Sequence, residues 1–373
     1  MKYTIAVIPG DGIGPEVTTQ AKKALDAIAE TYDHIFLYKE AQVGACAIEK
    51  TGDPLPAETI EICKKADAIL FGAIGELKYD NDPSLKVRPE QGLLRLRNEL
   101  ELFCNITPIK TYPKLIKNAP LKKEIIAETD IAIYRELSAG IYFGKKEVSK
   151  DKKSAFDVCS YTVEEISRVT HLAFKAAQER KKKVTLVDKA NVLETSRLWR
   201  KTVAKIGKQY KDVALDFMLV DNAAMQIVLH PKQFDVILSE NLFGDIISDV
   251  ACVIGGSIGI LASSSIGEKN ALFEPIHGSF PKAKGKDIAN PLASILSAAM
   301  LLEYLGLHDE ADAIQRAVEK SLDLGITTQD LKGKNQYAAS TAKVGDFIAD
   351  YIANQEDSNL NFTNIHMGQS TII

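Results

Sequence analysis

The stretch that decides the fold is YTIAVIPGDGIGPE, residues 3–16, in which an apolar run passes directly into a glycine-rich turn. Pro15 suits the first turn of a helix, and Glu16 favours the positive end of the helix dipole. The stretch therefore predicts a strand, a tight turn and a helix start. Its spacing, GxGxG, differs from the GxGxxG of Rossmann dinucleotide sites. A purely structural tight turn is the alternative.

Short apolar runs alternate with longer amphipathic segments along the rest of the chain. This alternation predicts an α/β fold with a mostly parallel sheet and helices on both faces. The expected strands are residues 3–9, 67–75, 130–137, 184–191, 214–221, 234–241 and 271–279, and the expected helices include 15–30, 163–181, 193–210 and 290–306.

Polar side chains follow many of these runs. Because ligands of open α/β sheets bind beyond the carboxyl ends of the strands, we expect the polar residues there to face one cleft. The alternative is that polar residues follow any strand. The residues concerned are Asp11, Arg135, Lys189, Asp221, Asn241, Glu274 and His277.

Composition favours a soluble globular protein with more than one core, since the chain has 373 residues, of which 46% are hydrophobic and 26% charged. A net charge of −4 gives no electrostatic reason to expect nucleic acid. The five cysteines are dispersed, as in a reduced cytoplasmic protein. The sequence has neither a signal peptide nor an apolar stretch of about 20 residues, so we expect no membrane association. Residues 143–153 read as an exposed basic excursion, and residues 354–373 as a surface arm or a disordered tail.

The segment RPEQGLLRLRNEL, residues 88–100, predicts a binding face. In a helix, Leu93, Leu94 and Arg97 share one side and Arg95 points the opposite way. An arginine beside two leucines suits a carboxylate that carries an apolar group. The alternative is an ordinary helix with a snorkelling arginine.

The segment NLFGDIISD, residues 241–249, predicts a metal site. Asp245 and Asp249 lie one helical turn apart, where like charges cost a few tenths of a kcal/mol, roughly 0.2–0.5. A divalent cation such as Mg²⁺ or Mn²⁺ would reverse the sign of that interaction. Asp221, at another strand end, is the candidate third ligand. The alternative is a solvated acidic face, which the apolar neighbours of the pair disfavour.

Two further segments carry candidates for proton transfer. In VDKANVLE, residues 187–194, Lys189 follows a strand and is a candidate base, with a structural ion pair as the alternative. In RELSAGIYFG, residues 135–144, Arg135 offers a fork for a carboxylate and Tyr142 is a candidate acid, with an ordinary half-buried aromatic as the alternative.

These motifs, together with FEPIHGSFPKAKGKDIANP at 273–291, occur in this order in one family. From residue 3 to about 352 the sequence resembles the β-decarboxylating dehydrogenases of 2-hydroxy acids, which include isopropylmalate, isocitrate, homoisocitrate and tartrate dehydrogenases. Leu93, Leu94 and Val192 match positions where the isopropylmalate branch cradles the isopropyl group, whereas isocitrate-type members carry polar residues there.

The resemblance implies a two-domain fold that is not a Rossmann fold, an NAD cofactor and an obligate homodimer with shared active sites. Residues 1–102 and 256–373 would form a discontinuous cofactor-binding domain, and residues 103–255 the dimerisation, substrate and metal domain. Hydride would pass to NAD⁺ and the β-carboxylate would leave as CO₂. Lys189 would help to deprotonate the hydroxyl, and Tyr142 would help to protonate the enolate.

The resemblance also implies a set of binding residues. Substrate would be bound by Leu93, Leu94, Arg97, Thr107, Arg135, Val192 and Asp221. Cofactor would be bound by Ile13, Gly75, Glu90, Glu274, His277, Gly278, Ser279, Lys282, Ala289 and Asn290. Mg²⁺ or Mn²⁺ would be held by Asp221 of the partner subunit with Asp245 and Asp249, and Lys189 would also come from the partner.

Two positions depart from the family pattern. The stretch NITP places Thr107 where the family usually has another carboxylate-binding arginine, and threonine cannot supply a charged fork. Lys282 stands where NAD-specific members commonly place an acid, and a cation there would attract a 2′-phosphate. Thr107 keeps a tartrate/malate or isocitrate specificity open. A non-catalytic regulatory subunit is the alternative from another class, and the presence of Tyr142, Lys189 and the three aspartates argues against it.

Overall fold

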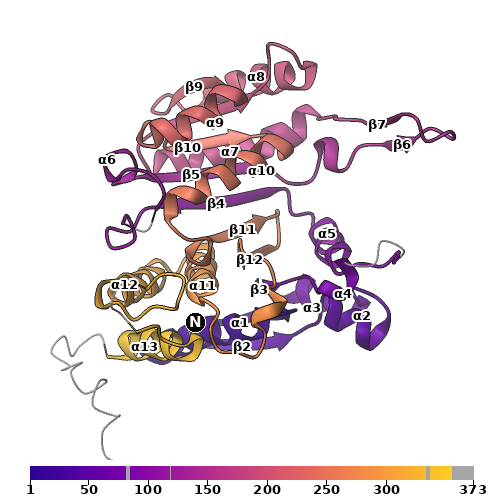
Figure 1. Ribbon diagram of the computed structural model, residues 1–373. Helices are drawn as coiled ribbons and strands as arrows, with labels where there is room; N and C mark the ends of the chain where they lie inside the picture. Colours follow the sequence, from indigo (N-terminus) through magenta and orange to yellow (C-terminus); the bar gives the residue numbers. More distant parts are fainter. Residues whose placement is uncertain (81–84, 118, 333–336, 355–373) are drawn as a thin grey trace, which may run out of the picture.

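The computed structural model describes residues 1–80, 85–117, 119–332 and 337–354. Its centre is a ten-stranded sheet with the order β2-β1-β3-β12-β11-β4-β5-β10-β8-β9 (Figure 1). The strands are β1 (Lys2–Gly10), β2 (Ile35–Glu40), β3 (Ala68–Ala73), β4 (Cys104–Lys110), β5 (Asp130–Glu136), β8 (Lys183–Asp188), β9 (Ala214–Leu219), β10 (Val236–Ser239), β11 (Ala262–Ile266) and β12 (Ala271–Pro275).

The sheet consists of two parallel wings that are joined through antiparallel pairs. One wing contains β2, β1, β3 and β12, and the other contains β5, β10, β8 and β9. Between them, β11 runs antiparallel to both β12 and β4, and β4 runs antiparallel to β5. The predicted mostly parallel α/β fold is therefore confirmed, and each of the seven expected strands is present.

The sequence pattern did not predict β2, β4 and β11, two of which form the join between the wings. β11 reads ASSSI and is mostly serine, and β4 reads CNITPIK and contains a proline. Neither has the continuous apolar run that marks a buried strand in a sequence. Neighbouring strands on both sides nevertheless satisfy their backbone groups, so pairing compensates for weak strand propensity.

Helices cover both faces of the sheet, as predicted (Figure 1). Helices α1, α11, α12 and α13 pack together on the first wing, and α7 and α8 pack on the second. The helices are α1 (Gly14–Thr31), α2 (Ala45–Thr51), α3 (Ala57–Lys65), α4 (Leu77–Asp80), α5 (Pro89–Glu99), α6 (Lys123–Ile126), α7 (Val163–Gln178), α8 (Glu194–Gly207), α9 (Val220–Leu229), α10 (Asn241–Cys252), α11 (Leu292–Tyr304), α12 (His308–Leu324) and α13 (Thr341–Ala353).

The hydrophobic core is continuous on one side of the sheet and divided on the other. The largest cluster includes Ile5 of β1 and Leu292 of α11 from the first wing together with Ile133 of β5 and Ile247 of α10 from the second. On the opposite side, one cluster surrounds Trp199 of the second wing, and a separate cluster packs against the first wing. The two wings thus share one hydrophobic core on one side of the sheet and have separate cores on the other.

The opening turn has a steric reason for its glycine. Gly10 adopts a φ of +71°, and a Cβ atom there would lie 2.0 Å from the carbonyl oxygen of Ala73. The backbone N–H of Asp11 donates to the same oxygen over 2.7 Å. Glycine therefore lets the ends of β1 and β3 approach closely, and α1 begins directly afterwards with Pro15 in its first turn.

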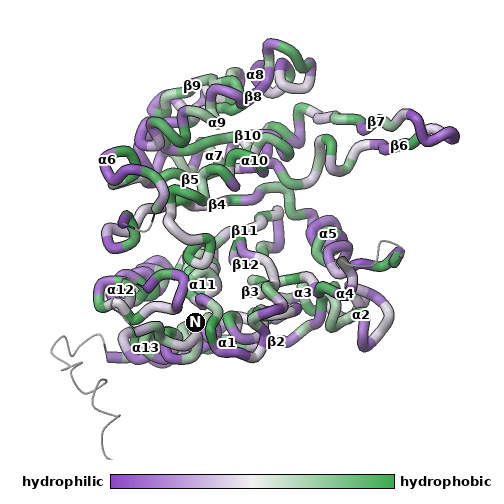
Figure 2. The backbone as a smooth tube through the Cα atoms, in the orientation of Figure 1, coloured by the Kyte–Doolittle hydropathy of each residue, from purple (hydrophilic) through white to green (hydrophobic). Residues whose placement is uncertain are grey.

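A two-stranded arm projects from the second wing (Figure 1). Its strands are β6 (Lys146–Val148) and β7 (Ala155–Asp157), which pair antiparallel, and Figure 2 shows that its tip is hydrophilic. The expected exposed excursion at 143–153 is confirmed and includes the first strand of a hairpin. Of the predicted tail, only Asn354 lies within the described residues. None of the helices in the described ranges is both long and apolar enough to cross a membrane.

We expect Gly10→Ala to destabilise the fold by about 1–3 kcal/mol more than Gly52→Ala, because only the former meets a backbone carbonyl. Gly52 is the matched control, since its φ is +78° and, among the described residues, none but its own chain neighbours comes within 4 Å of its added Cβ. The strain of a positive φ, about 1–2 kcal/mol, is then common to both variants. Urea unfolding measures the difference, and equal losses would contradict the steric explanation.

Candidate active site

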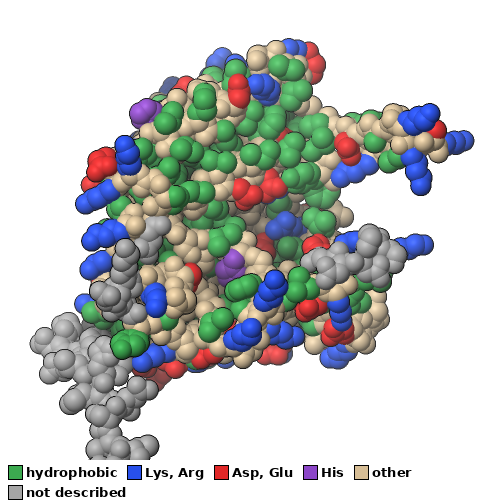
Figure 3. Space-filling model, viewed as in Figure 1, with side chains coloured by type: hydrophobic (Ala, Val, Ile, Leu, Met, Phe, Trp, Pro, Cys, Tyr) green, Lys and Arg blue, Asp and Glu red, His purple; other side chains and the backbone are tan. Residues whose placement is uncertain are grey.

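A cavity of about 460 Å³ lies where the two wings meet. Figure 3 shows the hollow between the two halves of the molecule, with acidic, basic and histidine side chains gathered in it. The cavity brings together thirteen residues that the sequence pattern singles out: Glu90, Leu93, Leu94, Arg97, Thr107, Arg135, Tyr142, Asn241, Asp245, Asp249, Glu274, His277 and Gly278.

Helix α5 contributes an apolar and basic face to this cavity. It begins at Pro89, within the expected segment 88–100, and it directs Leu93, Leu94 and Arg97 into the cavity. Arg95 points away and pairs with Asp53, so the predicted division of this helix is confirmed.

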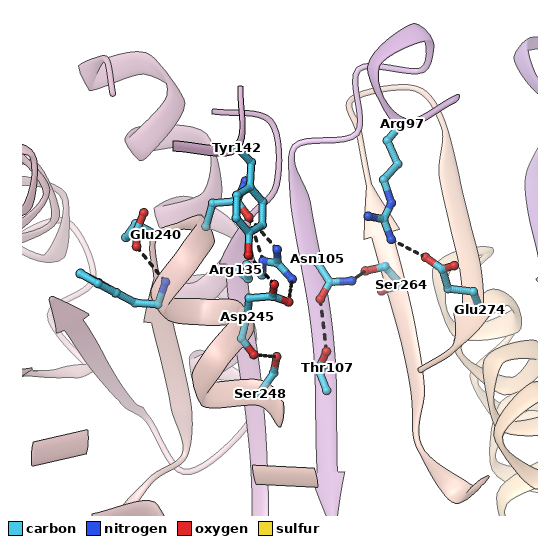
Figure 4. A network of polar contacts seen from close by, with 12 residues as sticks. Arg97, Asn105, Thr107, Arg135, Tyr142, Glu240, Asp245, Ser248, Ser264 and Glu274 are labelled. Carbon is cyan, nitrogen blue, oxygen red and sulfur yellow. Dashed lines mark hydrogen bonds and ion pairs between the residues drawn. The ribbon is translucent and has the colours of Figure 1, made fainter. Parts of the chain in front are cut away.

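Arg97 already holds one carboxylate. Its Nη2 donates to Oε1 of Glu274 over 2.9 Å, and the Glu274 side chain is only 9% exposed (Figure 4). The buried Nε of Arg97 has no hydrogen-bond partner among the described residues. A buried donor without a partner costs about 1–3 kcal/mol, which an anionic ligand in the cavity would relieve.

Strand β5 and helix α10 meet in a second polar cluster. Arg135, at the end of β5, pairs through Nη1 with Oδ1 of Asp245, and the Tyr142 hydroxyl donates to Oδ2 of Asp245 over 2.7 Å (Figure 4). Partial burial, with the hydrogen bond to Asp245 and its charge, raises the pKa of Tyr142 to about 12. The hydroxyl therefore stays protonated at neutral pH and is available as a proton donor.

The pair Asp245 and Asp249 lines the cavity from one face of α10, as the sequence predicts. Burial, and after it the charge of Asp245, raises the pKa of Asp249 above its usual range. A carboxyl whose ionisation is disfavoured by a neighbouring carboxylate fits a divalent cation, because the cation removes the repulsion. Within the described part of this single chain, however, no three Asp, Glu, His or Cys side chains gather into a metal site.

The other candidates, Lys189, Val192 and Asp221, lie outside the lining of this cavity. The Nζ of Lys189 donates to Oδ1 of Asp221 over 2.7 Å, and this bond lowers the pKa of the Asp221 carboxyl. Asp188, the chain neighbour of Lys189, instead pairs with Arg200. The base candidate and the third metal candidate therefore lie together, but apart from the rest of the site in one chain.

At Thr107 the cavity wall is neutral. Thr107 is 3% exposed, and its hydroxyl donates to Oδ1 of Asn105 over 3.2 Å. The Nδ2 of Asn105 donates in turn to the carbonyl oxygen of Ser264 over 3.1 Å (Figure 4). Hydrogen-bonding groups thus line this part of the wall, but it carries no positive charge for a carboxylate.

A second cavity of about 940 Å³ adjoins the first and shares His277 and Gly278 with it. It contains the cofactor candidates Ile13, Ala289 and Asn290. Burial lowers the pKa of His277, so its imidazole is neutral at physiological pH. An elongated ligand that occupies both cavities would therefore lie against an uncharged imidazole where the cavities meet.

The remaining cofactor candidates lie around the opening turn. The carbonyl oxygen of Ser279 accepts the N–H of Ile13 over 2.8 Å, and the N–H of Gly75 donates to Asp11 over 3.1 Å. Lys282 lies outside the lining of both cavities, whereas Lys286 lines the second.

The structure adds residues that sequence reasoning left out of the site. Asn105, Ser248 and Ser263 line the first cavity, and Asp330 lines the second. Asn241, which the sequence predicts at the cleft as the residue after an apolar strand, lines it as expected. Asp330 had no signal in the sequence, because it comes from a loop that approaches Asn290 only in the folded chain, where Nδ2 of Asn290 donates to it over 2.9 Å.

The fold and the cavity define a class: α/β enzymes that bind an anionic substrate between the two halves of one mixed sheet. Residues 4–348 match the model of the isocitrate/isopropylmalate dehydrogenase family, and the chain belongs to this family. The expected family membership is confirmed.

Proteins named 3-isopropylmalate dehydrogenase are among the similar sequences. The one from Bacteroides fragilis strain YCH46 is 49% identical over 94% of this chain and 99% of its own length. The one from Clostridium pasteurianum is 51% identical over 93% and 98%. Among solved structures, isocitrate dehydrogenase from Methylococcus capsulatus has a TM-score of 0.83 and 33% identity, with 94% of this chain and 99% of that chain covered.

Proposed function

We propose that this chain catalyses the NAD-dependent oxidative decarboxylation of 3-isopropylmalate to 4-methyl-2-oxopentanoate, a step of leucine biosynthesis. The observation that carries the proposal is the first cavity, which places Leu93 and Leu94 beside Arg97 and opposite Arg135. An apolar wall between cationic groups suits an isopropyl group on a dicarboxylic acid. The similarity to enzymes of that name over nearly the whole chain supports the same substrate.

The proposed chemistry assigns a separate task to each polar group. Arg97 and Arg135 bind the two carboxylates, and Lys189 of a second subunit takes the proton of the 2-hydroxyl. When bound, NAD⁺ supplies the hydride acceptor, and Mg²⁺ or Mn²⁺ on Asp245, Asp249 and the second subunit's Asp221 supplies a Lewis acid. After the β-carboxylate leaves as CO₂, Tyr142 delivers a proton to the enolate carbon.

The cofactor is proposed to span the two cavities, with the nicotinamide near Ile13, Gly75 and Glu90 and the adenosine against Ala289 and Asn290. The proposed cofactor domain, residues 1–102 and 256–373, contains these positions, and residues 103–255 form the other domain. We keep NAD as the cofactor. Lys282 lies outside the lining of the second cavity but only two residues from Phe280, which lines it. A cation at this position would attract a 2′-phosphate, so NADP is the competitor to test.

A homodimer is proposed because one chain does not assemble the whole set of functional residues. Lys189 and Asp221 lie outside the first cavity, as residues that serve a partner's site would. Helices α9 and α10 pack together and expose Met225, Leu229 and Ile246, each at least 50% exposed. Figure 3 shows that hydrophobic side chains gather over this half of the molecule. An apolar surface of this kind suits a two-fold interface.

We expect rapid NADH formation from 3-isopropylmalate with Mg²⁺ or Mn²⁺, and slow or no turnover of malate, tartrate and isocitrate. Initial rates with NAD and with NADP, recorded at 340 nm, measure both preferences. Preferred turnover of another acid would identify that acid as the substrate in place of 3-isopropylmalate. No turnover of any of the four acids would favour a regulatory subunit.

Thr107→Arg is expected to raise kcat/KM for 3-isopropylmalate at least severalfold, since a charge-assisted contact is worth about 1.5–3 kcal/mol. Thr107→Gln, which adds length without charge, is the matched control and should give a smaller gain. An unchanged or lower kcat/KM for the arginine variant would mean that Thr107 is part of a different carboxylate arrangement.

Mixing two inactive variants tests the shared site. Lys189→Ala and Asp245→Asn are each expected to be inactive, but random reassociation of their subunits would restore about one quarter of wild-type activity, because each hybrid has one site free of both changes. Activity after denaturation and refolding of the mixture is compared with that of each variant refolded alone. No recovery, with dimers present by light scattering, would place the whole site in one chain.

A further inference from the structure

We propose that Asn241 is a positioning residue that orients the guanidinium of Arg135 and, through it, the substrate carboxylate. The inference rests on the proposed function and deepens it. Asn241 is the first residue of α10, it is fully buried in the protein, and it lines the first cavity between Arg135 and the turn that leads to Tyr142.

Arg135 is held on two sides. The Oδ1 atom of Asn241 accepts from Nε over 3.0 Å and from Nη2 over 2.7 Å, and Asp245 pairs with Nη1. A guanidinium has five N–H donors, so these contacts leave one on each terminal nitrogen. Because the arginine plane is fixed by the asparagine, the remaining donors have a defined direction before a ligand arrives. Such pre-organisation lowers the entropy that binding would otherwise lose.

The remaining polar groups of Asn241 are also engaged. Its Nδ2 donates to the carbonyl oxygen of Ala139 over 3.0 Å, and its backbone N–H donates to the Tyr161 hydroxyl over 3.0 Å. Ala139 directly precedes the short 3₁₀ turn Gly140–Tyr142. One side chain thus connects the arginine, the start of α10 and the segment that carries Tyr142.

Buried contacts behind Asn241 keep it in place. The Tyr161 hydroxyl donates to Oε2 of Glu240 over 2.7 Å, and Oε1 of Glu240 accepts the N–H of Phe243 at the start of α10. Tyr161 packs edge-on against the buried Trp199, with ring centroids 5.4 Å apart. The position of Asn241 is therefore determined by the core of the second wing, and the cavity needs no ligand to fix it.

Close packing against α10 confines the aliphatic stem of Arg135. A Cβ atom at Gly244 would lie 2.8 Å from Cγ and 2.9 Å from Cβ of Arg135, so α10 lies directly against the aliphatic part of that side chain. The stem is confined by the helix, and the planar head group is oriented by Asn241 and Asp245.

The test is a double-mutant cycle in the full-length enzyme. We expect Asn241→Ala to raise KM for 3-isopropylmalate at least about tenfold and KM for NAD less than about twofold. In an Arg135→Ala background, the same change should add less than about a twofold effect, because the residue acts through the arginine. Equal effects in both backgrounds, or no change in KM for the acid, would overturn the inference.

Asn270→Ala is the matched control for the loss of a buried amide. The Nδ2 of Asn270 donates to the carbonyl oxygen of Cys63, and the residue lines neither cavity. It should lower the melting temperature without a change in KM. If Asn241→Ala does not fold, Asn241→Ser replaces it, since the shorter hydroxyl cannot bridge Nε and Nη2 in the same way.

The assay separates this inference from the proposed function. If wild type uses malate, tartrate or isocitrate instead, the proposed function fails and the cycle is repeated with that acid. If it turns over none of them, the cycle is measured as the dissociation constant of 3-isopropylmalate by calorimetry. In each case, a loss of affinity in Asn241→Ala that disappears in the Arg135→Ala background supports the positioning role of Asn241. A loss of affinity that persists in that background overturns this role.

Discussion

The site depends on the ion pair between Arg135 and Asp245, because this contact joins the end of a central strand to the helix that carries the acidic pair. The Arg135 side chain is only 12% exposed, so its charge must be matched inside the protein. Asp245 provides the match and also accepts the Tyr142 hydroxyl. One carboxylate thus fixes the relative positions of a binding residue and a candidate acid.

The join between the wings determines where this pair can act. β4 and β11 run antiparallel to their neighbours, and the cavity opens beside them. The core is continuous on one side of the sheet and divided on the other. This arrangement permits a cleft on one side without the loss of a common core, and it lets residues from both wings face one ligand.

The balance of charge in the cavity supports the proposed divalent cation. Glu90, Asp245, Asp249 and Glu274 face only two arginines, and the wall at Thr107 is neutral. These carboxylates would repel an anionic substrate at close range. A divalent cation on the aspartates would make the local interaction with the substrate attractive. Arg97 pairs with Glu274 and Arg135 pairs with Asp245, so the two arginines leave the charges of Glu90 on α5 and Asp249 on α10 unmatched.

The sequence by itself determined the α/β class, the opening strand–turn–helix, the binding face of α5 and the acidic pair of α10, because each depends on spacing within one element. Only the tertiary structure decided what depends on contacts between distant segments. The serine-rich β11 became a strand through pairing, Glu274 became the partner of Arg97 from 177 residues away, and Asn241 met Arg135 across 106 residues. Local patterns do not encode such partners, since long-range packing selects them.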